Sequence, residues 1–516
     1  MTEISSSPAP SGKSGTAAVI DVGSNSIRLV VYKGPRRAPL PILDEKVSCG
    51  LGRGMDTDGR MSPQSMDLAL RTVSRFVDIA RSMKVPVVKA VATAAVRDAA
   101  NGPDFKKAVE QQCGISLRVL SGMEEAKLSA LGTLCAIPYA DGIMGDIGGG
   151  SLELVEIREG QIENHATLPL GTIPLLESGL GPEKARKKLI APRLDELPWL
   201  EDAKKKTFYA VGGSWRALAK RHMESEDYPL RIVHGYSLSS SRALEMTQEV
   251  VDISPGSLRS LWIIGRNRTE SAPYAAALMK SLLKRTGVRD LMFCTYGLRE
   301  GCIYDDLPPE QRSLDPLIVM CREIALKMGR SVEDGEAFCR WIEPAIPDKS
   351  SGNPRLRLAA CHLSDIGISE HPEYRAEQVF LRILRMPFVG ITHPERVRVA
   401  FSVASRHAAI GNLIRRWEVS DFLSGSDIEE ARVTGLALRL AYTVSGGVTR
   451  ILESTRLERV GGKLTLHMPD QIPHPETVGR RLGALAKAVG CDYETIARGE
   501  DRGRSYSRRQ ISGDKI

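Results

Sequence analysis

The 516-residue chain lacks several features that would assign it to a specialised class of protein. It has no run of eighteen apolar residues, so we expect no membrane-spanning helix. Residues 1–15 have neither a basic segment nor an apolar stretch, so they are expected to be a disordered leader and not a secretory signal. The nine cysteines include no C-x-x-C pair, which favours a reducing cytoplasm over a disulfide framework or a zinc site.

Composition narrows the remaining possibilities. Hydrophobic residues make up 42% and charged residues 26%, as in soluble globular proteins, and the length predicts about three or four domains. Aromatic content is only 5%, so the basic stretches have little aromatic interleaving, and no specific nucleic-acid partner is expected. The net charge of +8 suits a polyanionic partner. Residues 311–516 contain 26 Arg and 5 Lys, a bias that suits phosphate recognition but that an Arg-rich genome explains equally well.

Strand-like and helix-like patterns alternate over the first 140 residues. Apolar, β-branched runs on both sides of a tight turn predict two buried strands within 17–33. An amphipathic pattern predicts a helix over 63–84, and the segment 86–99 that follows is expected to be a strand. The pattern continues with a helix to residue 112, a strand near 116–120 and a further helix from 121. This alternation predicts the α/β class.

An internal repeat is the most informative pattern. The segments 21–31 (DVGSNSIRLVV) and 146–156 (DIGGGSLELVE) align without a gap, and both predict a strand–turn–strand unit. Two copies of one uncommon element suggest two related subdomains that face each other across a cleft. A third glycine turn at 208–219 runs from a strand into a helix, and Ser214 is expected to cap that helix.

The repeated turns have the composition of an anion-binding site. Gly, Ser and Asn let successive backbone N–H groups converge on a phosphate. Each copy opens with a carboxylate, Asp21 or Asp146. A carboxylate next to a phosphate is unfavourable unless a cation lies between them, and Mg²⁺ binds one or two carboxylates together with phosphate oxygens. Two tight hairpins with capping aspartates are the alternative, which the matched pair makes less favoured. The predicted phosphate-binding residues of the turns are Gly23, Ser24, Asn25, Ser26, Gly148, Gly149, Gly150 and Ser151.

Two adjacent acids, Glu124 and Glu125, begin the helix predicted from residue 121. Ser121 and Glu124 have the S-x-x-E spacing of a capping box, which gives Glu124 a structural role. Glu125 has no such role and points about 100° further around the helix. Without further information, a solvated first-turn Glu favoured by the helix dipole explains Glu125 as well as a catalytic role does.

Five motifs together resemble one known family. DVGSNSIR, ATAAVRDA, SGMEEAKL, DIGGGSLEL and GLREG (297–301) occur in this order, and they resemble the exopolyphosphatase/guanosine pentaphosphate phosphatase (Ppx/GppA) family. That family belongs to the actin–hexokinase–Hsp70 superfamily of paired ribonuclease H-like domains. The resemblance implies two actin-like ATPase subdomains, at 16–138 and 139–305. It also implies Mg²⁺-assisted hydrolysis of a terminal phosphate from inorganic polyphosphate or from pppGpp.

The resemblance also assigns roles to the polar residues. Glu125 corresponds to the general base, and Asp146 and Glu153 to metal-binding or water-holding carboxylates. Asp21 is expected to be a further metal ligand. Arg28 shares a strand face with Ser26 and is expected to reach the cleft, and Arg97 is a candidate phosphate clamp. The glycine turn at 212–214 resembles the one that holds a nucleoside in ATP-using relatives, and we interpret it, like Gly297 and Gly301, as structural.

The last third of the chain has a different pattern. Residues 306–316 are expected to be a linker, 317–500 a mostly α-helical HD-like domain with a short strand pair near 458–468, and 501–516 a basic tail. HD phosphohydrolases bind metal through adjacent His and Asp, but here Ser364 precedes Asp365, so the metal site is expected to be lost. Several arginines are candidates for a polyphosphate groove, with a solvated mixed-charge surface as the alternative: Arg355, Arg357, Arg382, Arg385, Arg396, Arg398, Arg415 and Arg416.

The leading hypothesis is therefore a cytoplasmic, homodimeric exopolyphosphatase. A pppGpp 5′-phosphohydrolase on the same site is the main alternative. A sugar kinase or ATPase of the superfamily is disfavoured by the Glu-Glu-Ala helix start at 124–126. A silent polyphosphate or nucleotide sensor is disfavoured because the three acids Glu125, Asp146 and Glu153 are present.

Overall fold

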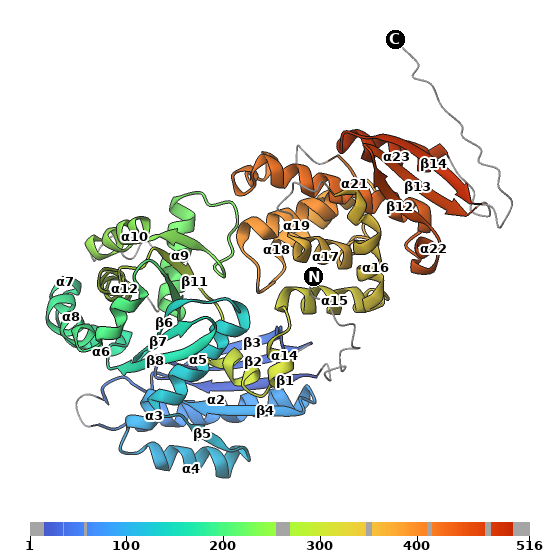
Figure 1. The fold of residues 1–516 in the computed structure, drawn as a ribbon. Helices are drawn as coiled ribbons and strands as arrows, with labels where there is room; N and C mark the ends of the chain where they lie inside the picture. Colours follow the sequence, from blue (N-terminus) through green and yellow to red (C-terminus); the bar gives the residue numbers. More distant parts are fainter. Residues whose placement is uncertain are drawn as a thin grey trace. The chain divides into compact units, whose positions relative to one another are not determined.

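The structure is a computed structural model that describes residues 15–34, 36–55, 59–253, 269–346, 353–409, 415–469 and 476–498. It divides into two compact units, Met1–Val319 and Met320–Ile516 (Figure 1). The predicted basic tail, and all of the predicted leader but its last residue, lie outside the described residues. Within the described ranges, no helix is long and apolar enough to cross a membrane.

The first unit contains two sheets of the same design, which confirms the α/β class (Figure 1). The first sheet has the strand order β3-β2-β1-β4-β5. Its strands β3, β2 and β1 pair antiparallel, and β4 and β5 run parallel to β1. The second sheet repeats this arrangement as β8-β7-β6-β9-β11 and adds β10 at its edge. The first sheet comprises β1 (Ala17–Val22), β2 (Ser26–Lys33), β3 (Leu40–Ser48), β4 (Val87–Ala92) and β5 (Leu117–Val119). The second comprises β6 (Gly142–Ile147), β7 (Leu152–Arg158), β8 (Gln161–Leu168), β9 (Thr207–Val211), β10 (Ser237–Ser239) and β11 (Asp290–Phe293).

Amphipathic helices cover these sheets and bury their apolar faces. Helix α2 begins where it was predicted, since the Ser62 side chain caps its start and Pro63 occupies its first turn, and it ends at Ser82, two residues before the predicted end. The long helices are α2 (Pro63–Ser82), α4 (Gly102–Cys113), α5 (Gly122–Ala136), α9 (Gly213–Ser225), α10 (Ser240–Asp252) and α12 (Ala272–Thr286). The short ones are α3 (Ala94–Asp98), α6 (Thr172–Glu177), α7 (Pro182–Ala185), the π-helical turn η1 (Arg186–Ile190), α8 (Ala191–Asp195), the 3-10 turn η2 (Pro198–Ala203), α13 (Leu298–Tyr304) and α14 (Pro309–Arg312).

Helices α5 and α13 connect the two sheets. α5 packs on β7 and β8 of the second sheet, while α13 packs on α5 and on β1 of the first. The two helices approach so closely that side chains are excluded at the crossing. A Cβ at Gly132 would lie 2.0 Å from the carbonyl oxygen of Gly297, and one at Gly301 would lie 1.8 Å from that of Leu128. The glycines of the GLREG motif therefore fix the position of α5, whose first turn carries Glu124 and Glu125.

Two local predictions about the first unit are wrong. The strand expected within 86–99 ends at Ala92, and the short helix α3 follows, so Arg97 lies on a helix. Helix α9 begins at Gly213, with Gly212 as its N-cap, so Ser214 lies inside the first turn and does not cap it. Gly212 has a φ of +106°, and a Cβ there would lie 2.5 Å from the carbonyl oxygen of Ile147, so only glycine fits.

The segment 306–316, predicted as a linker, is packed and partly helical. It contains α14, and the Arg37 guanidinium donates to the carbonyl oxygens of Arg312 (3.0 Å) and Leu314 (2.8 Å). The compact units separate after Val319, a few residues beyond the expected linker.

The second unit is mostly helical and carries one small sheet of order β12-β13-β14. Strands β12 (Arg456–Val460) and β13 (Lys463–Pro469) confirm the predicted strand pair, and β14 (Asp492–Arg498) adds a parallel strand that the sequence pattern did not predict. Its helices are α15 (Pro316–Lys327), α16 (Val332–Ile342), η5 (Glu343–Ala345), α17 (Pro354–His362), α18 (Arg375–Arg385), α19 (His393–Ser405), η6 (Ser420–Phe422), α21 (Gly425–Ser445), α22 (Thr449–Glu453) and α23 (Glu476–Ala488).

Candidate active site

The two repeated turns are closed by the same hydrogen bond. The amide of Gly23 donates to the carbonyl oxygen of Ser26 (3.1 Å), and the amide of Gly148 donates to that of Ser151 (2.9 Å). The sequence repeat is therefore also a repeat of backbone geometry, and each turn directs its intervening residues to the same edge of its sheet.

The turns face each other at close range. A Cβ at Gly149 would lie 3.2 Å from the Ser24 Cβ, and one at Gly150 would lie 2.9 Å from the Ser24 Oγ. Side chains at these positions would crowd the opposite turn, so glycine favours the close approach. Asn25 also lies at this contact, since its backbone nitrogen would be 3.3 Å from a Cβ on Gly149. The predicted phosphate-binding residues of both copies therefore meet in one place.

Glu124 and Glu125 have different surroundings. Ser121 and Glu124 form the predicted capping box, and Arg118 adds an ion pair of 2.6 Å, so the pKa of Glu124 falls to about 2. Glu125 instead points into the protein and is 8% exposed. Burial, together with the negative charges of Asp146 and Asp21, raises the pKa of Glu125 to about 7, although Arg97 opposes the shift. Only Glu125 has a pKa suited to exchanging a proton near neutral pH.

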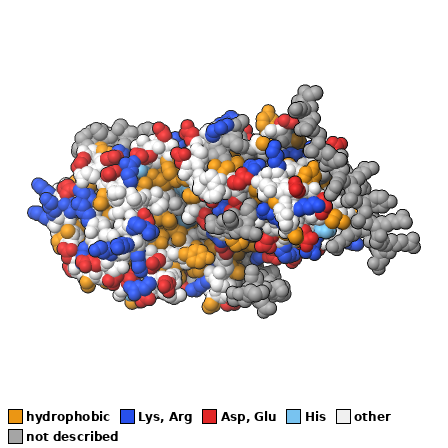
Figure 2. Space-filling view, turned by 45° about the horizontal axis from the view of Figure 1, so that its top comes forward, with side chains coloured by type: hydrophobic (Ala, Val, Ile, Leu, Met, Phe, Trp, Pro, Cys, Tyr) orange, Lys and Arg blue, Asp and Glu red, His pale blue; other side chains and the backbone are white. Residues whose placement is uncertain are grey.

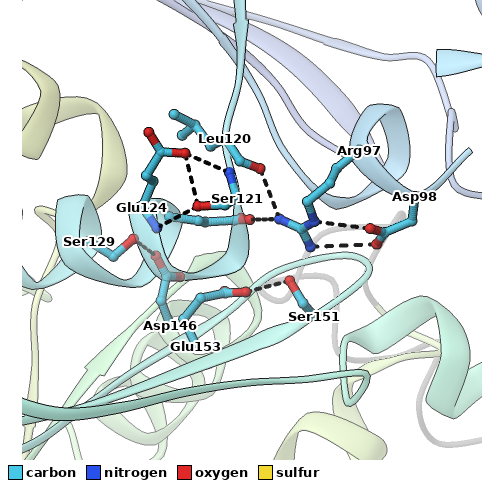
Figure 3. Close-up of polar contacts among 10 residues, drawn as sticks. Arg97, Asp98, Leu120, Ser121, Glu124, Ser129, Asp146, Ser151 and Glu153 are labelled. Atoms are coloured by element: carbon cyan, nitrogen blue, oxygen red, sulfur yellow. Dashed lines mark hydrogen bonds and ion pairs between the residues drawn. The ribbon is translucent and has the colours of Figure 1, made fainter. Parts of the chain in front are cut away.

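Two further carboxylates lie near Glu125 and come from the two strands of the second hairpin. Asp146 on β6 is the direct ladder partner of Glu153 on β7. Asp146 accepts a hydrogen bond from Ser129 Oγ (2.8 Å), and Glu153 accepts one from Ser151 Oγ (2.5 Å) (Figure 3). Burial raises the pKa of both groups, and the charges of Glu125 and Asp146 raise that of Glu153 further. The acids lie close enough to repel one another.

Arg97, the predicted phosphate clamp, pairs with acidic side chains in this structure. Its Nη1 donates to Glu125 Oε2 (2.8 Å) and to the carbonyl oxygen of Leu120 (3.3 Å), and its Nε pairs with Asp98 Oδ1 (3.0 Å) (Figure 3). Arg97 is also absent from the residues that line the cavity. The guanidinium therefore orients Glu125 and stabilises its charged form.

The first hairpin has one acidic and one basic residue at the positions where the second hairpin has two acidic residues. Asp21 is the ladder partner of Arg28, as Asp146 is of Glu153. Arg28 lines the cavity as predicted, and it forms a bidentate pair with Asp44 of the neighbouring strand. Asp21 also lines the cavity, where its Oδ2 pairs with Arg299 Nη1 (2.8 Å).

These residues enclose a cavity of ≈ 190 Å³. The cavity is lined by both repeated turns, by the turn at 212–214 and by eight charged side chains. Four of these are acidic (Asp21, Glu125, Asp146 and Glu153) and four are basic (Arg28, Lys46, Arg216 and Arg299). The volume is below the roughly 300–1,000 Å³ of pockets for drug-sized ligands. The cavity therefore suits a compact, charged group such as a terminal phosphate.

Sequence reasoning missed three of the four basic residues, Lys46, Arg216 and Arg299. Lys46 lies opposite Arg28 in the ladder between β2 and β3, a pairing that only the strand register reveals. Arg216 lies in the first turn of α9, and Arg299 lies inside the GLREG motif, whose glycines were interpreted as structural. Basic residues directly after glycine turns were the available signal.

The acidic residues form a donor set that fits a hard cation. All four offer oxygen ligands, and burial raises the pKa values of Glu125, Asp146 and Glu153, an effect that a bound cation would offset. Within the described part of the chain, no three or more His, Cys, Asp or Glu side chains are arranged to hold a metal by themselves.

The HD-like segment of the second unit has a cationic centre. Asp365 pairs with Arg330 and with Arg406 Nη1 (3.1 Å), and Ser364 shares a 2.7 Å hydrogen bond with the Tyr442 hydroxyl. The guanidinium carbon of Arg406 lies 3.4 Å from the centroid of the Tyr442 ring. Arginines thus neutralise the carboxylate that an HD enzyme would use for metal binding.

The arginines proposed as a polyphosphate groove are largely matched by acids. Arg355 pairs with Glu395 (3.2 Å), Arg398 with Asp427 (3.1 Å) and Arg416 with Glu377 (3.1 Å). Arg396 is fully buried and donates to backbone carbonyls, among them that of Phe388 (3.0 Å). On the face shown in Figure 2, basic and acidic side chains of the described residues are interspersed. For Arg355, Arg398 and Arg416, these ion pairs favour the mixed-charge surface over the polyphosphate groove.

Comparison with known proteins identifies the family. Residues 30–310 match the family model described as the Ppx/GppA phosphatase family, and residues 317–496 match that of the exopolyphosphatase C-terminal domain. The chain belongs to the Ppx/GppA phosphatase family. The family resemblance inferred from the five motifs is thus confirmed, and it now extends over the second unit.

Individual members of the family are distant relatives. Exopolyphosphatase 1 of Mycobacterium leprae is 28% identical over 312 residues, which span 57% of this chain and 89% of the relative. Exopolyphosphatase 1 of Mycobacterium tuberculosis is 32% identical over 186 residues, 36% of this chain and about half (53%) of the relative. Retrograde regulation protein 2 of Saccharomyces cerevisiae is 25% identical over 433 residues, 75% of this chain and 72% of the relative. A crystal structure of an exopolyphosphatase from Cytophaga hutchinsonii shares the fold, with a TM-score of 0.51 and 24% identity over 57% of this chain and 99% of that chain.

Proposed function

We propose that this protein is an exopolyphosphatase, which hydrolyses the terminal phosphate of inorganic polyphosphate and releases orthophosphate. The observation that carries the proposal is the position of Glu125. Its carboxylate is buried, has a pKa of about 7, and lines the same cavity as the two facing glycine turns. A proton acceptor beside two phosphate cradles suits hydrolysis by an activated water.

Each part of the cavity has a role in this reaction. The backbone of the turns at 23–26 and 148–151 holds the terminal phosphate, and Arg28 and Arg299 offset its charge. Glu125 accepts the proton of the attacking water, and the hydrogen bond from Arg97 keeps the carboxylate oriented. Bound Mg²⁺ would be held by one or two of the carboxylates Asp146, Glu153 and Asp21, and would neutralise charge on the phosphate oxygens.

The decisive assay is orthophosphate release from long-chain polyphosphate, measured with and without Mg²⁺. We expect Mg²⁺-dependent release that stops when the cation is chelated. Absence of release from any chain length, in a folded protein, would refute the proposal.

Hydrolysis of pppGpp at the same site is the second candidate. It is favoured by one observation, namely that the turn at 212–214 also lines the cavity. This turn resembles the one that holds a nucleoside in ATP-using members of the superfamily. Side-by-side assays with pppGpp and polyphosphate separate the two activities, and a kcat/KM for pppGpp above that for polyphosphate would reverse the assignment.

We further propose a cytoplasmic homodimer. All nine cysteines are free thiols, and most of them are buried, which suits a reducing compartment. Light scattering on the purified protein tests the dimer, and a mass of one chain, 56.4 kDa, would contradict it. Fractionation of cells that express the protein tests its location.

A further inference from the structure

The hydroxyl of Ser129, on α5, donates outside its own helix. A buried Ser or Thr in a helix commonly donates to the carbonyl oxygen four residues earlier, as Ser281 on α12 does to Ala277 (3.0 Å). Thr133, one turn further along α5, likewise donates to the carbonyl oxygen of Ser129 (3.3 Å). Ser129 itself is fully buried, and its Oγ donates instead to Oδ2 of Asp146 on β6 (2.8 Å) (Figure 3). The contact joins a helix hydroxyl to a carboxylate that lines the cavity.

Ser129 and the proposed proton acceptor lie on one face of α5. Ser129 follows Glu125 by four residues, about one helical turn, so the two side chains lie on the same side of the helix. Gly132 lies almost one turn further along this face, where a Cβ would be 2.0 Å from the carbonyl oxygen of Gly297. Helix α5 therefore holds Glu125 and Ser129 at a fixed spacing, with α13 packed closely against it.

The two carboxylate oxygens of Asp146 have different surroundings. Oδ2 accepts the hydrogen bond from Ser129, and a Cβ on Gly297 would lie 3.4 Å from it. Oδ1 accepts no hydrogen bond from the other described residues, and Asp146 lines the cavity. Burial raises the pKa of Asp146, and the hydrogen bond from Ser129 opposes that rise, so this bond favours the charged carboxylate. The hydroxyl thus occupies one oxygen and leaves the other for a ligand.

We propose that Ser129 is a positioning residue for the cation of the active site, whose hydroxyl holds Asp146 Oδ2 so that Oδ1 is available to the cation. Hydrogen bonds of this kind orient metal-binding carboxylates, and their loss costs about 10–100-fold in metal affinity. Because Glu125 and Ser129 belong to one helix, α5 sets the positions of both the proton acceptor and a cation ligand. The inference rests on the proposed function for the identity of the cation as Mg²⁺.

A purely structural role for the hydroxyl is the alternative. In that case Ser129 only satisfies a buried carboxylate, and its loss would lower stability without a selective effect on cation binding. The two roles therefore differ in how the affinity for the cation responds to the loss of the hydroxyl.

Cation binding by the full-length protein without substrate tests the inference. Mn²⁺ is the probe, because it binds the same oxygen ligands as Mg²⁺ and is detected by electron paramagnetic resonance. The variant is Ser129→Ala, and the matched control is Ser281→Ala, which removes a buried helix hydroxyl away from the cavity. We expect the Kd for Mn²⁺ to rise at least about tenfold in Ser129→Ala and less than about twofold in Ser281→Ala. Ser129→Thr keeps a hydroxyl and should bind Mn²⁺ more tightly than Ser129→Ala.

Several outcomes would overturn the inference. These are equal Kd values for Mn²⁺ in Ser129→Ala and Ser281→Ala, an equal loss of affinity in Ser129→Thr and Ser129→Ala, and a parent protein that binds no Mn²⁺. Orthophosphate release gives an independent readout, since the deficit of Ser129→Ala should be largest at low Mg²⁺ and should shrink as Mg²⁺ is raised. A deficit that is the same at every Mg²⁺ concentration would indicate the purely structural role. Failure of the proposed function is distinguishable, because it appears as absence of release from a parent protein that still binds Mn²⁺.

Discussion

Replacement of Glu125 by Gln is the most direct test of the mechanism. The amide has the size of the carboxylate, and its oxygen can still accept the 2.8 Å hydrogen bond from Arg97. The change therefore removes the proton acceptor and leaves the cavity intact. Loss of a general base costs about 10²–10⁴-fold in rate, equivalent to about 3–5 kcal/mol in the activation barrier. We expect kcat for orthophosphate release to fall by this factor while polyphosphate binding is retained.

Glu124→Gln is the matched control, because it changes the adjacent acid in the same way. Glu124 caps α5 and pairs with Arg118 on the surface, so its replacement should lower the free energy of unfolding by about 0.5–1 kcal/mol. Its kcat should stay within about twofold of the parent. Full turnover by Glu125→Gln together with inactivity of Glu124→Gln would show that the two acids have been assigned the wrong roles.

Three further predictions follow from the same contacts. Arg97→Gln removes the group that opposes the rise in the pKa of Glu125, so the acidic limb of the pH–rate profile should move to higher pH. The activity of that variant should fall more at pH 7 than at pH 9; a uniform rise in KM would instead identify a phosphate clamp. Gly150→Ala places a Cβ 2.9 Å from Ser24 Oγ and should reduce kcat/KM at least tenfold with little change in Tm. Unchanged kinetics would show that catalysis does not depend on the close approach of the two turns. Asp365→Ala removes the acidic partner of Arg330 and Arg406 and should lower the free energy of unfolding by about 3 kcal/mol. Orthophosphate release at saturating Mg²⁺ should not be abolished, and a transition metal bound at Asp365 would contradict this assignment.

The sequence allowed much of the first unit to be predicted because its signals are local. The repeat at 21–31 and 146–156 predicted two related halves, and the two sheets share one strand order. The S-x-x-E spacing predicted which of the two glutamates caps the helix, and the structure confirms this capping box. Each copy of the repeat and the capping box is a short segment, within which backbone preference decides the local structure.

The cavity cations could not be predicted in the same way, because they meet through long-range packing. Arg299 reaches Asp21 across 278 residues of sequence, and Lys46 lies beside Arg28 only through strand register. The pairing of Arg97 with Glu125, 28 residues away, was likewise not predicted. In the second unit, composition indicated many arginines but not which ones are neutralised, since that depends on helix packing.

The pairing of Arg97 with Glu125 accounts for how a buried acid remains usable as a base. Burial and two neighbouring carboxylates, Asp146 and Asp21, all favour the protonated form, which cannot accept a proton from water. Arg97 counteracts these effects and leaves the pKa near 7, where both forms are populated at neutral pH. A carboxylate with an ordinary pKa would be charged at pH 7 but would be a weaker base, whereas one raised much further would stay protonated. Rates should therefore rise with pH up to about 7 and then level off, because the charged form of Glu125 is the active one. A pH–rate profile that is flat between pH 5 and 8 would show that Glu125 does not act as the base.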